Sequence, residues 1–162
     1  MQNNDVFRRL RYIFDYDDNK MIALFHSSNL IVTRSQVSDW LKKEEDSEFV
    51  EITDVELASF LNAVIVDKRG KKEGPEPIPE SRLNNNLIFR KLRIALNYKD
   101  EDILEILSSM DMDISKHELN AFFRSPSQPQ FRPCKDQILR KFLFGLQRKM
   151  RPNQPTPTDE FE

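Results

Sequence analysis

The chain has 162 residues, of which 38% are hydrophobic and 32% are charged, and its formal net charge is −2. This length allows one ordinary domain or two small ones, and no stretch approaches the roughly 20 apolar residues needed to cross a bilayer. The single cysteine, Cys134, cannot form an internal disulfide, and no apolar run of signal-peptide length follows the first arginines. These features exclude a membrane span and a disulfide framework, and they predict a cytoplasmic protein.

Sixteen residues near the start are repeated almost unchanged in the second half. NNDVFRRLRYIFDYDD begins at Asn3 and NNLIFRKLRIALNYKD begins at Asn85. A shift of 82 positions extends this match without a gap to Arg69 and Arg151. Identical pairs include Phe7/Phe89, Arg8/Arg90, Leu10/Leu92, Arg11/Arg93, Tyr16/Tyr98, Asp54/Asp136, Leu57/Leu139 and Phe60/Phe142. We therefore expect two tandem copies of one small domain, at residues 3–69 and 85–151, rather than a solenoid.

Apolar residues within each copy recur at the spacing of a helix, not at the alternation of a strand. The first helix has asparagines available as N-caps, and the second is expected to begin near an aspartate that can cap it. The expected caps are Asn3 or Asn4 and Asn85 or Asn86 for the first helix, and Asp18 and Asp100 for the second. The pattern predicts an all-α fold with four helices in each copy.

Capping boxes mark the third and fourth helices. In this motif a hydroxyl accepts from the backbone N–H three residues on, while a Gln or Glu reaches back to the cap's own N–H. The boxes are Thr33 with Gln36, Ser115 with Glu118, and Thr53 with Glu56. The fourth helix of the second copy lacks the hydroxyl, so the box is absent there.

The segments outside the copies have a different composition. Residues 70–84 include GKKEGPEPIPESR, whose prolines and glycines predict an extended linker without helix or strand. Residues 152–162 are rich in proline and polar side chains, so we expect a disordered tail.

These residues together resemble a known family. Asn-Asn-x-x-Phe-Arg-x-Leu-Arg at Asn3 and Asn85, and Asp-x-x-Leu-x-x-Phe-Leu at Asp54 and Asp136, are similar to the YehS-like family of bacterial proteins. That family is built from two tandem copies of a domain of unknown function, number 1456. The resemblance covers nearly all of the chain except the linker and tail. It implies a small cytoplasmic all-α protein and no established activity.

Catalytic, metal and nucleotide signatures are absent from the sequence. A nucleophilic Cys134 would need a basic partner, but His26 and His117 belong to different copies and neither lies in a motif. No His or Cys pair has metal-ligand spacing, and the three glycines form no phosphate-binding loop. We expect no enzyme activity and no cofactor.

Nucleic-acid binding has two candidate surfaces. The second and third helices of each copy loosely resemble a helix-turn-helix, whose candidate contacts are Arg34, Gln36, Lys116 and Asn120. The first and last helices of the second copy are rich in basic residues that suit phosphate or an acidic partner. These residues are Arg90, Lys91, Arg93, Lys135, Arg140, Lys141, Arg148 and Lys149. The duplicated arginines Arg8/Arg90 and Arg11/Arg93 have an alternative role, pairing with duplicated acids inside the fold.

The charge of the two halves differs in sign and bears on the partner. Residues 3–69 carry nine basic and thirteen acidic side chains, whereas residues 85–151 carry thirteen basic and eight acidic ones. Such asymmetry is typical of halves that attract each other, of ordinary solvated surface, or of contact with a charged partner. We therefore interpret the protein as a non-enzymatic helical binding module, a protein-interaction or regulatory adaptor with an unidentified protein partner. Nucleic-acid binding is the alternative, and the sequence leaves the oligomeric state open.

Overall fold

The computed structural model describes residues 1–153, and this part of the chain forms eight helices and no strand. The first copy contains α1 (Asn3–Ile13), α2 (Asp18–Ser27), α3 (Arg34–Leu41) and α4 (Asp54–Arg69). The second copy contains α5 (Asn85–Leu96), α6 (Asp100–Ser108), α7 (Lys116–Phe122) and α8 (Asp136–Met150). The predicted all-α fold with two four-helix copies is confirmed. The prediction of a disordered tail falls, from residue 154 on, outside the described residues.

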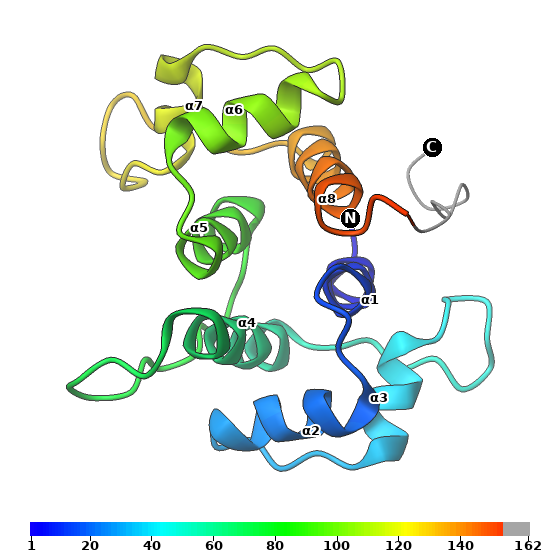
Figure 1. Ribbon diagram of the computed structural model, residues 1–162. Coiled ribbons are helices and arrows are strands. Elements are labelled where there is room, and N and C mark those ends of the chain that lie inside the picture. Colours follow the sequence, from blue (N-terminus) through cyan, green and yellow to red (C-terminus); the bar gives the residue numbers. More distant parts are fainter. Residues whose placement is uncertain (154–162) are drawn as a thin grey trace.

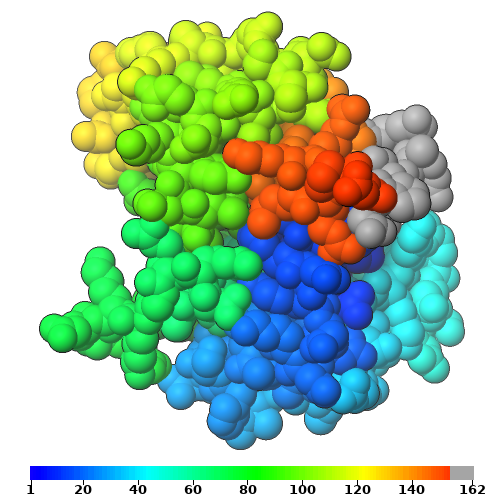
Figure 2. All heavy atoms as spheres, in the orientation of Figure 1, coloured from blue at the N-terminus to red at the C-terminus, as the bar shows by residue number. Residues whose placement is uncertain are grey.

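The two copies pack on each other through their first and last helices. Figure 1 shows α1, α4, α5 and α8 nearly end-on in the middle of the molecule, with α2 and α3 on one side and α6 and α7 on the other. Helix α4 contacts α5, and α1 contacts α8. The α4–α5 contact and the α1–α8 contact are equivalent, because α1 of the first copy corresponds to α5 of the second, and α4 corresponds to α8. The linker, which protrudes from one side in Figures 1 and 2, therefore joins two copies that already share an interface.

Equivalent phenylalanines form equivalent cores. Phe60 and Phe142 are both fully buried, and their rings lie 4.9 Å from Phe7 and 4.8 Å from Phe89, respectively. Trp40 is only 2% exposed and packs against the rings of Phe7 and Phe25. The duplicated apolar pattern thus produces the same core twice.

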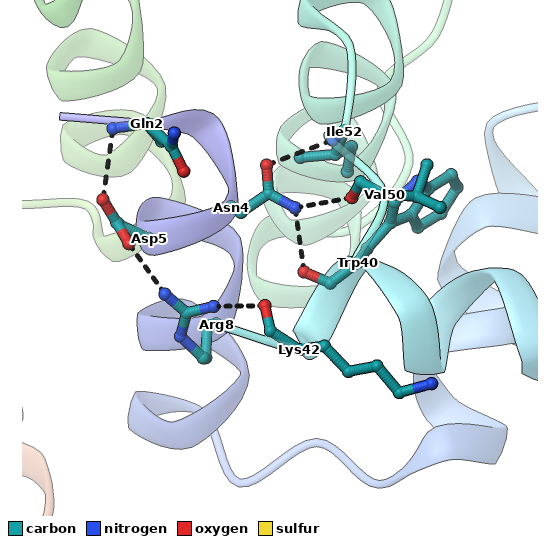
Figure 3. Close-up of polar contacts among 8 residues, drawn as sticks. All are labelled: Gln2, Asn4, Asp5, Arg8, Trp40, Lys42, Val50 and Ile52. Atoms are coloured by element: carbon teal, nitrogen blue, oxygen red, sulfur yellow. Dashed lines mark hydrogen bonds and ion pairs between the residues drawn. The ribbon is translucent and has the colours of Figure 1, made fainter. Parts of the chain in front are cut away.

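The paired asparagines do not cap the first helices, and that prediction was wrong. Helix α1 is capped by Gln2 and α5 by Asn84. In Figure 3 the Asn4 side chain points away from α1 toward the chain between α3 and α4. Its amide donates to the carbonyls of Trp40 and Val50, each at 2.9 Å, and its Oδ1 accepts from Ile52 N–H at 3.1 Å.

The second copy repeats this contact with its own asparagine. Asn86 donates to the carbonyls of Phe122 and Arg132 at 3.0 and 2.9 Å, and it accepts from Cys134 N–H at 2.9 Å. The backbone of this loop has no neighbouring strand with which to form hydrogen bonds. The asparagine amide, which both donates and accepts, satisfies its carbonyls and N–H instead. The asparagines therefore hold the α3–α4 and α7–α8 loops against the first helix of each copy.

The other helix starts follow the sequence in part. The capping boxes at Thr33, Ser115 and Thr53 are present, whereas Lys135, at the N-cap position of α8, makes no side-chain cap. Asp18 and Asp100 are the first residues inside α2 and α6 rather than their caps, because the preceding residues, Asp17 and Lys99, take the cap position. Their carboxylates instead pair with arginines of the neighbouring helix.

The two copies also exchange contacts at their starts. The Met1 ammonium lies 2.6 Å from Asp136 Oδ2, and the equivalent Leu83 N–H donates to Asp54 Oδ2 at 2.9 Å. Each aspartate also accepts from the asparagine of its own copy, Asn3 to Asp54 at 2.6 Å and Asn85 to Asp136 at 2.7 Å. The start of each copy is thereby fixed to the last helix of the other.

Candidate anion-binding face

The basic side chains of α5 are used inside the fold. Arg90 donates to the carbonyl of Phe123 at 2.8 Å, and Arg93 lies 2.8 Å from Asp100 Oδ1. The first copy repeats both contacts. Arg8 donates to the carbonyl of Lys42 at 3.0 Å (Figure 3), and Arg11 lies 3.4 Å from Asp18. The predicted pairing with duplicated acids therefore holds for Arg11 and Arg93, whereas Arg8 and Arg90 bind backbone carbonyls of their own copy instead.

Lys91 is used inside the fold as well, at the contact between the copies. Its ammonium donates to Asn62 Oδ1 of α4 at 2.6 Å and lies 3.0 Å from Glu80 of the linker. The Lys91 side chain is only 12% exposed. Such a shielded ammonium links α5, α4 and the linker, and it offers no surface to an external anion.

The helix-turn-helix candidates also have internal partners. Arg34 donates to Asn19 at 2.6 Å and to Asp18 at 3.3 Å, while Gln36 completes the cap of α3. In the second copy Lys116 lies 3.2 Å from Glu101, and Asn120 is half-buried in α7. A reading helix needs side chains that reach base edges, whereas Arg34, Gln36 and Lys116 are bound to their own copy. Nothing in this arrangement favours base recognition.

The remaining candidates come together on one helix, and we call them the cationic face of α8. This face consists of Arg140, Lys141 and Arg148 beside the half-buried ring of Phe144, whereas Lys135 precedes the helix and Lys149 lies on its other side, over the Tyr98 ring. Arg140, Lys141, Phe144 and Arg148 are separated by one, three and four residues, so they lie on the same side of the helix. The face thus combines positive charge with an aromatic surface.

The cations of this face have few internal partners. Arg148 lies 3.6 Å from Met110 Sδ and 5.8 Å from the Phe144 ring, while Lys149 lies 4.9 Å from the Tyr98 ring. Among residues 1–153, no carboxylate lies within ion-pair distance of Arg140, Lys141 or Arg148. These three cations therefore form no ion pair with an acid of residues 1–153, although the Asp136 carboxylate and Arg140 attract each other at longer range.

The acid at the start of α8 is already engaged. Hydrogen bonds from the Met1 ammonium and from Asn85 lower the pKa of Asp136 below its ordinary value. The carboxylate is hydrogen-bonded to the other copy and to Asn85, and the charge of Arg140, one turn along the helix, also helps to lower its pKa. A shallow hollow of about 430 Å³ adjoins the face between α6 and α8, lined by Glu105, Ile106, Ser109, Gly145, Arg148 and Lys149.

The first copy has no equivalent face. The positions of Arg140, Lys141 and Phe144 correspond to Ala58, Ser59 and Asn62 of α4, all of which are buried. The basic residues of α8 were recognisable from the sequence because periodicity places them outside the apolar stripe. The sequence could not show that Arg90, Lys91 and Arg93 of α5 do not join this face, because the residues that bind them lie on other parts of the chain.

Cys134 lies in the core of the second copy. It is 5% exposed, and burial raises the pKa of its thiol to about 12. His26 and His117 are exposed on separate copies. No cluster of three possible metal ligands occurs in residues 1–153, and no helix in that range is long and apolar enough to span a membrane.

Comparison with known proteins agrees with the duplicated fold. Residues 3–70 and 85–151 each match the family described as "Protein of unknown function (DUF1456)". The chain belongs to this family. It is also 42% identical over 147 residues to the "Uncharacterized protein YehS" of Escherichia coli (strain K12), a match that covers 90% of this chain and 94% of the relative. No solved structure matches the chain.

Proposed function

We propose that the protein is a non-catalytic binding module that holds an acidic segment of a partner protein on the cationic face of α8. The observation that supports this is that Arg140, Lys141 and Arg148 lie on one side of α8 and that none of them forms an ion pair with a carboxylate of residues 1–153. Carboxylates of the partner would pair with the guanidinium and ammonium groups. Burial of Cys134 and the separation of the histidines further favour binding over catalysis.

A protein partner fits the face better than a nucleic acid. The basic residues that remain available are few and lie along one helix, whereas affinity for a duplex comes largely from many Lys and Arg contacts to phosphates. A long polyanion crossing the contact between the copies would also meet the first copy, in which residues 3–69 carry nine basic and thirteen acidic side chains. An acidic protein segment can be limited to the length of α8. We therefore place the protein among interaction or regulatory adaptors.

Binding of defined probes tests the proposal. A fluorescein-labelled peptide of eight glutamates around one phenylalanine, a labelled 20-base-pair DNA duplex and a labelled single-stranded RNA are titrated with the protein at low salt. We expect the peptide to bind and the triple variant Arg140→Glu, Lys141→Glu and Arg148→Glu to weaken this binding at least tenfold, about 1.4 kcal/mol. The matched control reverses the exposed Lys43, Lys71 and Lys72 of the first copy and the linker, and it should retain the affinity.

The outcomes separate the two kinds of partner. Binding of the duplex or RNA more tightly than the peptide, lost in the α8 variant, would establish the nucleic-acid alternative and reject the protein partner. Equal loss in the α8 variant and the control would show only nonspecific attraction and also reject the proposal. Helical circular dichroism and Trp40 fluorescence of each variant confirm that the fold is intact.

A further inference from the structure

Helices α4 and α5 lie parallel where the two copies meet. The N–H of Leu83, at the start of the second copy, donates to Asp54, the first residue of α4. Farther along the same two segments, Lys91 of α5 donates to Asn62 of α4 at 2.6 Å. Because the two contacts are equally far apart along both segments, the helices run in the same direction.

Helices α1 and α8 repeat this arrangement on the other side of the molecule. The Met1 ammonium lies 2.6 Å from Asp136, the first residue of α8, and farther along Arg9 donates to Gln147 at 2.7 Å. Arg9 and Gln147 are both buried. Each of these hydrogen bonds joins one copy to the other, so the contact requires a first and a second copy but no covalent connection between them.

The parallel packing makes the linker a crossover connection. It leaves the end of α4 and must return to the start of that helix, where Leu83 is bound to Asp54. Helix α4 has 16 residues, which corresponds to about 24 Å. The segment from Arg69 to Leu83 can extend to about 46 Å, so it spans this distance with roughly twice the necessary length. Residues 70–78 are exposed, and this half of the linker is the slack part of the connection.

We propose that the contact between the copies also forms between two chains, so that two molecules exchange their second copies and associate as a closed dimer. Each first copy then binds the second copy of the other chain through the same α4–α5 and α1–α8 contacts. The exchange preserves every bond between copies, so the linker decides between monomer and dimer. A flexible connection of this length keeps the copies at an effective concentration on the order of millimolar, which favours the monomer in dilute solution. The exchange does not depend on the proposed function, but it would present the cationic face twice on one particle.

Shortening the linker tests the exchange, because it removes the closed monomer and leaves both copies unchanged. After deletion of residues 71–79, the segment from Arg69 to Leu83 spans at most about 18 Å, less than the length of α4. We expect this variant to have twice the 19.2 kDa mass of the chain in light scattering after gel filtration. The matched control replaces residues 71–79 by a Gly-Ser segment of equal length and should remain a monomer.

Two further measurements identify the surface that holds the dimer. Arg9→Glu in the shortened chain should raise the dissociation constant at least tenfold, because it removes the buried bond to Gln147. The unchanged chain, refolded from urea at about 1 mM, should contain a dimer that is missing after refolding at about 1 µM, since only the first concentration approaches the effective one.

Each opposite result would overturn the inference. A monomeric shortened chain would show that the copies do not bind across chains, and loss of its helical circular dichroism would show that they depend on the linker for folding. A dimeric Gly-Ser control, or a dimer indifferent to Arg9→Glu, would place the association on another surface. A chain that refolds only to monomer at about 1 mM would likewise reject exchange with the native linker.

Discussion

Replacement of Asn4 by alanine should destabilise the first copy strongly. The Asn4 side chain is fully buried and makes three hydrogen bonds of 2.9, 2.9 and 3.1 Å to the backbone of Trp40, Val50 and Ile52. Loss of the amide leaves two carbonyls and one N–H without a partner, each at a cost of about 1–3 kcal/mol when buried. Because Val50 lies near the surface and water can reach its carbonyl, we expect a loss of about 3–5 kcal/mol in the free energy of unfolding.

Urea denaturation followed by fluorescence measures this loss directly. Trp40 is the only tryptophan, lies in the core of the first copy, and has its carbonyl bonded to Asn4. The midpoint should fall at an unchanged slope, and the melting temperature should fall by roughly 10 °C for a chain of this size.

The duplicate residue supplies the control. Asn86→Ala removes three equivalent bonds, but Asn86 is only half-buried and its bond to Arg132 is exposed, so the loss should be smaller. A loss below about 1 kcal/mol for Asn4→Ala, or a larger loss for Asn86→Ala than for Asn4→Ala, would refute the assignment of these asparagines as loop anchors.

Three further predictions follow from the cores and from the shifted pKa values. Phe60→Ala and Phe142→Ala should each cost about 3–5 kcal/mol in urea denaturation, and a loss near zero for either would contradict the equivalence of the cores. Cys134 should react with a thiol reagent at pH 8 at least tenfold faster in urea than in the native protein, since burial raises its pKa; equal rates would refute its burial. Burial opposes ionisation of Asp67, but hydrogen bonds from Lys20, its ion-pair partner, and from Tyr16 hold its pKa below the ordinary 3.8. The contribution of Asp67 to stability is present above its pKa in the unfolded chain and is lost as pH falls through its lower pKa in the folded protein. Asp67→Asn should therefore make the free energy of unfolding fall less steeply as pH is lowered. An unchanged dependence on pH would contradict the ion pair.

The helices and the repeat could be predicted from the sequence for a local reason. Helical spacing, capping boxes and turn residues involve positions a few residues apart, so each copy's pattern carries its own structure. Thr33 and Ser115 cap their helices as expected, and Phe60 and Phe142 occupy matching cores. The basic residues of α8 were likewise visible because they interrupt no apolar stripe.

Contacts between distant residues could not be read in the same way. An asparagine side chain can cap a helix or form hydrogen bonds with the backbone of a loop. Asn4 bonds to the loop because Val50 and Ile52 lie beside α1, and only the tertiary structure shows this. An arginine's charge is equally visible whether it faces solvent or a carbonyl of another helix, as Arg90 does.

Sequence by itself determined that the chain is two copies of one helical unit, because repeated apolar spacing dictates repeated cores. Tertiary structure alone decided that α4 meets α5 and α1 meets α8, and hence which cations are buried between the copies and which remain on α8. The reason is that helix pairing between copies depends on the shapes and charges of whole surfaces, which no short stretch of sequence contains.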